Sequence, residues 1–435
     1  MTVDLARLYQ AFEPAPLKPG QQKDLYVDLS AVRGEHEVGG IAKKLAMCMR
    51  LSKGPTCQLL TGHRGSGKST ELYRLERELG AGTPKLFAVF CDIDEALNRN
   101  DLDFPDLLLA IVRQLAIQVK TKLGIELRKS YFQDRFEELK ELLGREVNLE
   151  TLELGEGMAK VVGTIKASPK AREQVRAMLE PRVDSLLHAA NDVIAQTRDA
   201  LKGKGYSDLV LIVDNTDHLA RRDGEGAERF PGENLFIRRY SEVSRFDCHV
   251  VYAIPLELAY SVRESEIKRL YGCKTPVVGV TKVRDKNGSP FEMGIDRFRE
   301  VIRKRVAFAG ASMAEVFESD AVRDELILLT GGQPLELCAL IRECVLGGLP
   351  IRSERLTEVK RQEHRGYARW LQRRHWNIIQ QIRAGQQPMP DDSNALALRD
   401  LIEGRVILYH MNDEDWLAVS PLVGEPPAQL SESDG

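Results

Sequence analysis

Short apolar runs alternate with longer amphipathic stretches through the first two thirds of the chain. The apolar runs have the length of strands and lie at residues 57–61, 85–94, 207–219, 248–255 and 275–283. Segments between them, such as 104–124, repeat their apolar residues with the period of a helix. Because parallel strands are joined by helical crossovers, this alternation predicts an α/β fold with a parallel five-stranded sheet.

From about residue 296 the pattern becomes helical, and near the end it changes to helix, strand, tight turn and strand at 394–423. These changes divide the chain into consecutive parts: an N-terminal arm at 1–35, a core at 36–290 with a helical insert at about 125–205, helices at 291–355, a further domain at 356–424, and a tail at 425–435 that we expect to be disordered. We expect the arm to pack on the core.

Composition changes this picture little. The chain has 435 residues, and its 43% hydrophobic and 29% charged content is typical of globular proteins. A net charge of −3 gives no overall attraction to nucleic acid. No apolar run approaches the roughly 18 residues of a membrane span, and the N-terminus lacks the features of a secretory signal. The seven cysteines form no CxxC pair, which favours free thiols and a cytoplasmic location.

Residues 62–69 match the phosphate-binding pattern G-x-x-x-x-G-K-[ST] between a strand-like run and a helix. Glycines let backbone N–H groups converge on a phosphate chain, and the helix start adds positive potential. Lys68 would reach the β- and γ-phosphates, and the Ser69 hydroxyl would bind Mg²⁺. We therefore expect ATP and Mg²⁺ as ligands, held by the segment Gly62, His63, Arg64, Gly65, Ser66, Gly67, Lys68, Ser69 and Thr70.

A second acidic site follows the apolar run that ends at Asp214. The carboxyl ends of parallel strands are where ligands bind, so Asp214 is predicted to hold the Mg²⁺ coordination shell. Asp217 is a candidate to orient or deprotonate an attacking water. The alternative for Asp217 is a structural one, as the cap of a following helix.

These motifs resemble those of the P-loop ATPases of the AAA+ and STAND groups, over roughly residues 20–120 and 205–420. The resemblance implies an ASCE-type sheet in which the Walker A strand lies beside the sensor strand and the sensor strand beside the Walker B strand. It also implies a helical lid at 291–355 and a winged helix at 356–424. Gly332-Gln333-Pro334 occupies the place of the lid motif that packs near the nucleotide, so Pro334 is a candidate contact. The alternative is punctuation between two helices.

Two departures from the family pattern point to slow hydrolysis. Asn215 stands where these enzymes usually carry Glu, and an amide cannot act as a base. The sensor strand ends in the apolar residues Ala253 and Ile254 instead of a polar residue. Arg263 and Arg269 are available as an arginine finger, and the sequence does not choose between them.

The segment 352–383 carries nine basic residues against three acidic ones and is interleaved with aromatic residues, which suits a phosphate backbone. Its aromatic spacing of three to four equally suits a helix packed on a core. The hairpin tip at 412–415 carries three carboxylates, which would repel DNA. We therefore favour packing or protein docking over nucleic-acid binding for this region.

The main interpretation is an ATP-binding, slowly hydrolysing regulatory switch. Its nucleotide state would control homo-oligomeric assembly or engagement of a separate effector protein, as in bacterial defence or transcription-control modules. The alternative is an ATP-dependent DNA-loading ATPase resembling origin-recognition or transposition ATPases. A third interpretation is a scaffold with a relic nucleotide site.

Overall fold

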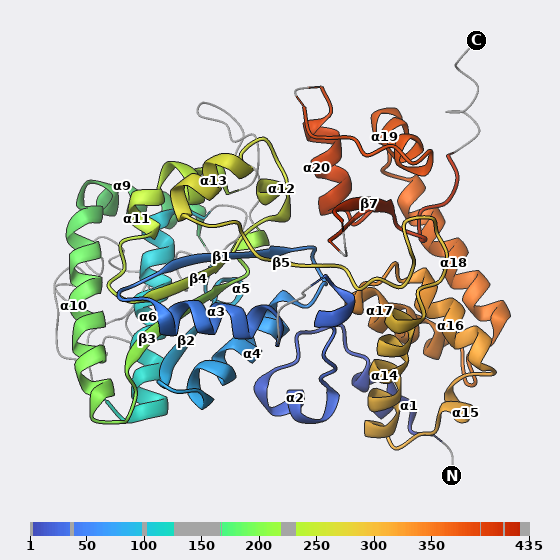
Figure 1. Ribbon diagram of the computed structural model, residues 1–435, viewed down its shortest axis with the longest axis horizontal. Helices are drawn as coiled ribbons and strands as arrows, with labels where there is room; N and C mark the ends of the chain where they lie inside the picture. The colour runs from blue at the N-terminus through green and yellow to red at the C-terminus, as the bar shows by residue number, and fades with distance from the viewer. Residues whose placement is uncertain are drawn as a thin grey trace. The chain divides into compact units, whose positions relative to one another are not determined.

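A computed structural model describes residues 3–34, 39–97, 102–125, 166, 168–218, 232–391, 393–411 and 414–426 (Figure 1). Most of the expected helical insert, the tail beyond residue 426 and two residues of the hairpin tip lie outside this part of the chain. The chain forms two compact units. Unit 1 comprises Met1–Ile41, Gly62–Tyr73 and Val277–Gly435, and unit 2 comprises Ala42–Thr61 and Arg74–Pro276.

The sheet has five strands in the order β2-β3-β4-β1-β5. They are β1 (Cys57–Gly62), β2 (Leu86–Asp92), β3 (Asp208–Asp214), β4 (His249–Ala253) and β5 (Val277–Val278). The pairs β2–β3, β3–β4 and β1–β4 are parallel. Strand β1 therefore lies beside β4, and β4 lies beside β3, which is the strand order that the resemblance implied. This order confirms the predicted fold class.

Burial explains why these segments are continuous apolar runs. The side chains of Val210, Leu211 and Ile212 in β3 are fully buried, as expected for a strand covered on both faces. Helix α6 (Phe104–Leu123) starts with a capping box formed by Asp103 and Asp106. Together with α10 (Val183–Lys202), it packs against β2 and β3.

The other elements of the chain between residues 40 and 276 are mostly short helices that surround this sheet (Figure 1). They are α3 (Gly40–Leu51), α4 (Lys68–Ala81), α5 (Ile93–Ala96), α9 (Pro169–Leu179), η3 (Glu180–Arg182), η4 (Thr216–His218), η5 (Asn234–Arg238), α11 (Tyr240–Val243), α12 (Leu256–Ala259) and α13 (Glu264–Tyr271).

Unit 1 is built mainly from helices. The arm contributes α1 (Leu5–Ala11), α2 (Pro19–Leu25) and η1 (Ser30–Val32), and the lid contributes α14 (Glu292–Phe308), α15 (Met313–Val316), α16 (Asp320–Leu329), α17 (Pro334–Leu346) and α18 (Ser353–Ala368). The C-terminal part contributes α19 (Arg373–Arg383), α20 (Ala395–Glu403) and the antiparallel hairpin of β6 (Ile407–His410) and β7 (Trp416–Val419).

The arm packs into the lid and also contacts residues 66–70 of the expected core, where Leu17 donates to Thr70 and Arg33 to Ser66. Leu8 of α1 and Phe12, which follows the helix, are fully buried in one hydrophobic cluster with Phe298 of α14 and Leu337 of α17. An amphipathic arm has no preferred partner until a large apolar surface is available, and the lid helices present that surface. The arm is therefore an integral part of the lid core.

The fifth strand is shorter than the predicted run at 275–283. Only two of its residues are assigned to the strand, because the following backbone pairs elsewhere within unit 1. The Thr281 N–H donates to the Gly332 carbonyl at 3.0 Å, and the Lys282 N–H donates to the Val32 carbonyl at 2.8 Å. The turn between α16 and α17, residues 330–333, is called the lid turn. The backbone hydrogen bonds of the segment after β5 thus connect this segment to the lid turn and to the arm.

The basic segment does not form one long helix. It breaks between α18, which ends at Ala368, and α19, which starts at Arg373. Leu371 and Trp376 are buried, whereas the Trp370 side chain is 39% exposed. Trp376 therefore packs in the core, whereas Trp370 is partly exposed and packs at the surface against the His375 ring, with centroids 5.6 Å apart.

Candidate nucleotide-binding site

The loop that follows β1 has the backbone conformation that an anion-binding loop requires. It turns at Gly65 and Gly67, with φ of +81° and +102°, and leads directly into α4 at Lys68. L-residues rarely adopt such angles, so glycine is needed at both positions. Backbone N–H groups in loops of this kind converge on phosphate oxygens at the positive end of the helix.

Polar groups in the loop suit a phosphate ligand. The Lys68 side chain is 6% exposed, and its ammonium group donates to the carbonyls of Gly62 and His63 at 2.7 and 2.9 Å. The Ser66 hydroxyl is buried and has no hydrogen-bond partner among the described residues. Such an orphaned polar atom is rare in native interiors and indicates a place for a polar ligand. The loop therefore fits the phosphate chain of a nucleotide.

The remaining loop residues are half-buried. Arg64 and Ser69 lie on either side of the turn, and the Thr70 hydroxyl accepts a hydrogen bond from the Leu17 N–H of the arm at 3.1 Å. Thr70 is thus used to anchor the arm to α4. The Ser69 hydroxyl lies in the first turn of the helix, where P-loop proteins place the hydroxyl that binds Mg²⁺.

His63 connects the loop to the C-terminal hairpin. Its side chain is 2% exposed, and its Nε2 accepts a hydrogen bond from the backbone N–H of Tyr409 in β6 at 2.7 Å. Burial, helped by the nearby charge of Lys68, lowers the pKa of His63 to about 3. The imidazole is therefore neutral at physiological pH, which this hydrogen bond requires.

The start of α17, directly after the lid turn, also contacts the phosphate-binding loop. The Leu335 N–H donates to the Gly65 carbonyl at 3.3 Å, and a methyl group on Gly65 would lie 2.5 Å from the Leu335 Cβ. Gln333 is 1% exposed, and its Oε1 has no partner in the described part of the chain. Pro334 forms the first residue of α17. Leu335, the residue directly after the predicted lid motif, thus contacts the loop, and the nucleotide contact of Pro334 stays a prediction.

Arg33 is a residue of the site that sequence analysis missed. Its side chain is 4% exposed, and its guanidinium donates to the Ser66 carbonyl at 2.5 Å. It lies in the arm directly after η1, and a Cβ on Gly67 would be 3.4 Å from its Nη2. Its only sequence signal is a charged residue after the apolar run of the arm, which does not distinguish it from surface arginines.

In unit 2, the ends of β1 and β3 lie at the same edge of the sheet. Tyr252 of β4 is in register with both Leu59 and Val213, so Asp214 and the last residues of β1 end at one level. The Asp214 side chain is 2% exposed. Asp217 is half-buried in the short helix η4, as its second residue. Residues 219–231 lie outside the described part of the chain, so the catalytic and the capping interpretation of Asp217 both stay predictions.

Asn215 is held in a specific conformation. Its φ is +64°, an angle that Asn tolerates better than most residues, and its side-chain amide donates to Asp92 at 2.7 Å. This position carries no carboxylate, as the sequence indicated. The sensor strand likewise ends in the fully buried apolar residues Ala253 and Ile254.

The two candidate finger arginines differ in their surroundings. Arg263 forms ion pairs with Glu233 at 2.9 Å and Glu266 at 3.1 Å. The Arg269 side chain is 76% exposed and lies 3.9 Å from Glu266. The identity of a finger stays open.

The C-terminal hairpin is further fixed within unit 1 by ion pairs. Arg405, which precedes β6, lies 2.6 Å from Glu336 of α17. Glu414 at the hairpin turn lies 3.0 Å from Lys286. The Arg405–Glu336 pair and the hydrogen bond of His63 fix the hairpin to α17 and to the phosphate-binding loop, whereas the exposed Lys286–Glu414 pair adds little.

The sheet order, the glycine loop at the start of α4, the helical lid and the C-terminal helix–hairpin domain together define the fold of a P-loop NTPase with a winged helix. No family model matches the sequence, and no curated protein matches it.

Three of the solved structures that match this chain are the following. The Walker-type ATPase PABY2304 of Pyrococcus abyssi is 16% identical, with 95% of this chain and 98% of that chain covered and a TM-score of 0.45. Cdc6p from Pyrobaculum aerophilum is 11% identical, with coverage of 95% and 94% and a TM-score of 0.39. The Aeropyrum pernix ORC1 protein, solved in complex with DNA, is 16% identical, with coverage of 85% and 77% and a TM-score of 0.34. Similarity at this level carries no assignment of function.

Proposed function

We propose that this protein is an ATPase that binds ATP at the loop of residues 62–69 and uses the nucleotide to control the lid and the winged helix. The observation that carries this proposal is the convergence of three parts of unit 1 on that loop. Arg33 of the arm, Leu335 of the lid and Tyr409 of the hairpin each form a hydrogen bond with a loop residue. A change in the conformation of the loop would therefore alter the hydrogen bonds of all three parts.

The residues take the following roles in this proposal. Lys68 leaves the two loop carbonyls and binds the phosphate chain together with the backbone N–H groups. Ser69 and Asp214 are the residues that would hold Mg²⁺, and the bound ion would supply charge neutralisation at the phosphates. Asp217 orients the attacking water. Because Asn215 cannot accept a proton, turnover is slow and the nucleotide acts mainly as a conformational ligand.

The consequence would be nucleotide-dependent assembly or engagement of a partner protein. The space between the loop and the lid is small, because even a Cβ on Gly65 would come too close to Leu335. Phosphate binding in this space would displace the lid turn and the hairpin. We infer that ATP exposes a surface for a second copy of the chain or for a separate effector protein. No helix in the described part of the chain has the length and apolar character to span a bilayer.

Isothermal titration calorimetry with ATP and ADP tests the site. Lys68→Ala should abolish measurable binding, whereas Arg303→Ala, which removes an exposed charge on α14, should bind like the wild type. Size-exclusion chromatography without nucleotide, with ADP and with a non-hydrolysable ATP analogue then tests the coupling. Equal affinity of wild type and Lys68→Ala would refute the nucleotide site, and one elution volume in all three states would refute the assembly.

A second candidate function is DNA binding, as in a DNA-loading ATPase. Arg361, Arg365 and Arg369 are exposed, are spaced by four residues along α18 and its C-cap, and make no ion pair with a described residue. Residues four apart lie on one face of a helix, so these form a basic stripe, next to the partly exposed Trp370. Such a stripe suits a phosphate backbone.

Fluorescence anisotropy with labelled duplex DNA separates the two candidates. DNA binding predicts an affinity that falls steeply with salt and a smaller salt slope when the three arginines of the stripe are changed to Gln. A triple variant that binds DNA like the wild type at low salt would remove the stripe from this function.

A further inference from the structure

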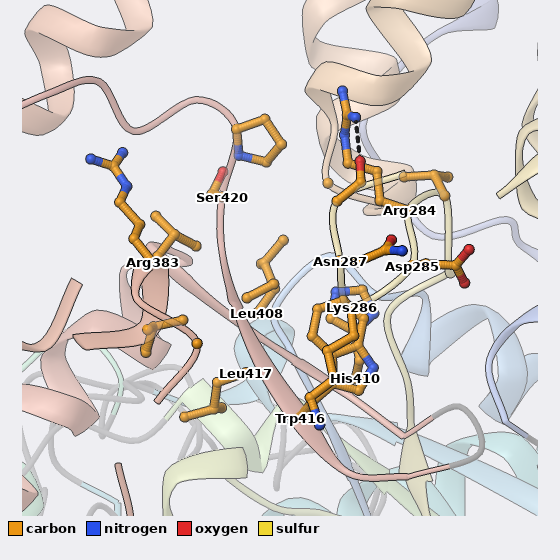
Figure 2. Close-up of a pocket in the computed structure, with 18 of the residues that line it drawn as sticks. Arg284, Asp285, Lys286, Asn287, Arg383, Leu408, His410, Trp416, Leu417 and Ser420 are labelled. Atoms are coloured by element: carbon orange, nitrogen blue, oxygen red, sulfur yellow. Dashed lines mark hydrogen bonds between the residues drawn. The ribbon is translucent and has the colours of Figure 1, made fainter. Parts of the chain in front are cut away.

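A pocket of about 480 Å³ lies within unit 1, beside the C-terminal hairpin. Figure 2 shows Arg284 and Asn287 of the loop before α14 on one side, and Arg383 and Ser420 on the other. Its size is within the range of small-molecule sites, which are about 300–1,000 Å³. The pocket shares no residue with the phosphate-binding loop.

One wall of the pocket is apolar and aromatic. Leu408 and His410 are alternate residues of β6, so their side chains share one face of the hairpin. The His410 ring stacks on Trp416, with centroids 4.1 Å apart and planes 8° from parallel. A Cβ on Gly331 would lie only 2.5 Å from Leu408, so this wall is packed closely against the lid turn. The part of this wall that lines the pocket is apolar and aromatic, although its three side chains are only 1–7% exposed.

The Nδ1 atom of His410 in this wall is a polar atom without a hydrogen bond among the described residues. The His410 side chain is 3% exposed. Burial, with a contribution from the charge of Lys282, lowers the pKa of His410 to about 3, so the ring is neutral. Leaving a buried polar atom unpaired is energetically unfavourable. A ligand in the pocket that bonds to this nitrogen would remove that cost.

The loop of residues 284–287, which lies on the same side of the pocket as the His410–Trp416 stack (Figure 2), carries two positive charges. Arg284 donates to the Gly288 carbonyl at 2.9 Å and forms no ion pair within the described ranges. Lys286 pairs with Glu414 at 3.0 Å, but both side chains are about half exposed or more, at 46% and 64%, so the pair contributes little and can exchange partners. Asp285 is already paired with Lys282 at 2.9 Å. Arg284 and Lys286 are therefore available to an anion.

We propose that this pocket binds a small organic anion with a flat, apolar body. The body lies on the wall of Leu408 and the His410–Trp416 stack, the His410 nitrogen forms one hydrogen bond, and Arg284 and Lys286 bind the anionic group. The binding site itself does not depend on nucleotide binding. Tyr409 lies between Leu408 and His410 and donates to His63 of the phosphate-binding loop, so a bound anion would also act on that loop; this consequence rests on the proposed function.

Titration calorimetry on the full chain tests the site with three probes: 2-naphthoate and indole-3-acetate as flat anions, and 2-naphthamide as a neutral match for the first. We expect saturable 1:1 binding of at least one anion and at least tenfold weaker binding of the amide. The double variant Arg284→Ala/Lys286→Ala should weaken anion binding at least tenfold. Arg303→Ala/Arg352→Ala removes two exposed charges of unit 1 away from the pocket and should leave binding unchanged.

Two further variants separate this site from the nucleotide site and from misfolding. Lys68→Ala should bind the anion like the wild type. Ala418→Leu places a larger side chain on a lining position and should block binding while circular dichroism stays native. The proposal is overturned if neither anion binds saturably, if the amide binds as tightly as the acid, or if the charge and pocket-filling variants bind like their controls.

Discussion

The hydrogen bond from Tyr409 to His63 allows a direct test of whether the hairpin is held by the phosphate-binding loop. His63→Phe keeps a ring of similar size and removes the acceptor. His63→Gln offers an amide oxygen at similar reach and can accept the same hydrogen bond. The two variants therefore differ mainly in whether the Tyr409 N–H keeps a partner.

The expected magnitude follows from burial. Tyr409 is 7% exposed and its N–H lies 2.7 Å from the His63 Nε2, so in His63→Phe the donor is left buried and unpaired. That costs about 1–3 kcal/mol. At about 1.4 kcal/mol for a factor of ten, local opening of β6 becomes roughly 5- to 150-fold more frequent. In His63→Gln most of this loss is restored.

Amide hydrogen exchange at pH 7, resolved at Tyr409, measures this opening. We expect exchange at least fivefold faster in His63→Phe and within about threefold of wild type in His63→Gln. The Leu417 N–H provides an internal control, because it donates to the Gln387 side chain at 2.7 Å on the other edge of the hairpin. Its protection should be equal in all three proteins.

Unchanged protection of Tyr409 in His63→Phe would refute the reasoning, because the hydrogen bond would then not hold β6. Equal acceleration at Tyr409 and Leu417 would also contradict it, since the whole hairpin would then be opening for another reason.

Three further predictions concern pH, turnover and the ion pair of the hairpin. The pKa of His63 is about 3 in the folded chain and near 6.5 in the unfolded chain, so the free energy of unfolding decreases as the pH is lowered from 6.5 to 3. Between pH 6 and pH 4, the free energy of urea unfolding should decrease about 1.4 kcal/mol per pH unit more steeply for the wild type than for His63→Gln. Parallel curves for the two proteins would contradict this. Asp217→Asn should bind ATP like the wild type and hydrolyse it at least tenfold more slowly in a phosphate-release assay, and an equal rate would remove Asp217 from the mechanism. A double-mutant cycle of Arg405→Ala and Glu336→Gln should give a coupling of about 1 kcal/mol in urea unfolding, because the pair is 2.6 Å apart and partly buried; additive effects would show that it does not fix the hairpin.

The parts of this protein that the sequence predicted are those that depend on neighbours along the chain. Five apolar runs became strands, and the glycine spacing at 62–69 became a left-handed turn before a helix, because strand burial and glycine angles are local requirements. The strand order was available only through the resemblance of the motifs to a known family. The position of Asp214 at the end of β3 was predicted from the apolar run that it terminates.

Tertiary structure decided what surrounds the loop. The arm joined the lid core, and the fifth strand ended early because its backbone pairs with Val32 and Gly332. Arg33 reached Ser66 across 33 positions, and Tyr409 reached His63 across 346. Every residue except proline has a backbone N–H, so residue type does not indicate which N–H group will donate to a distant acceptor. Only packing of the whole chain determines which N–H meets which acceptor, and that is why the sequence located the phosphate-binding loop but not the segments that hold it.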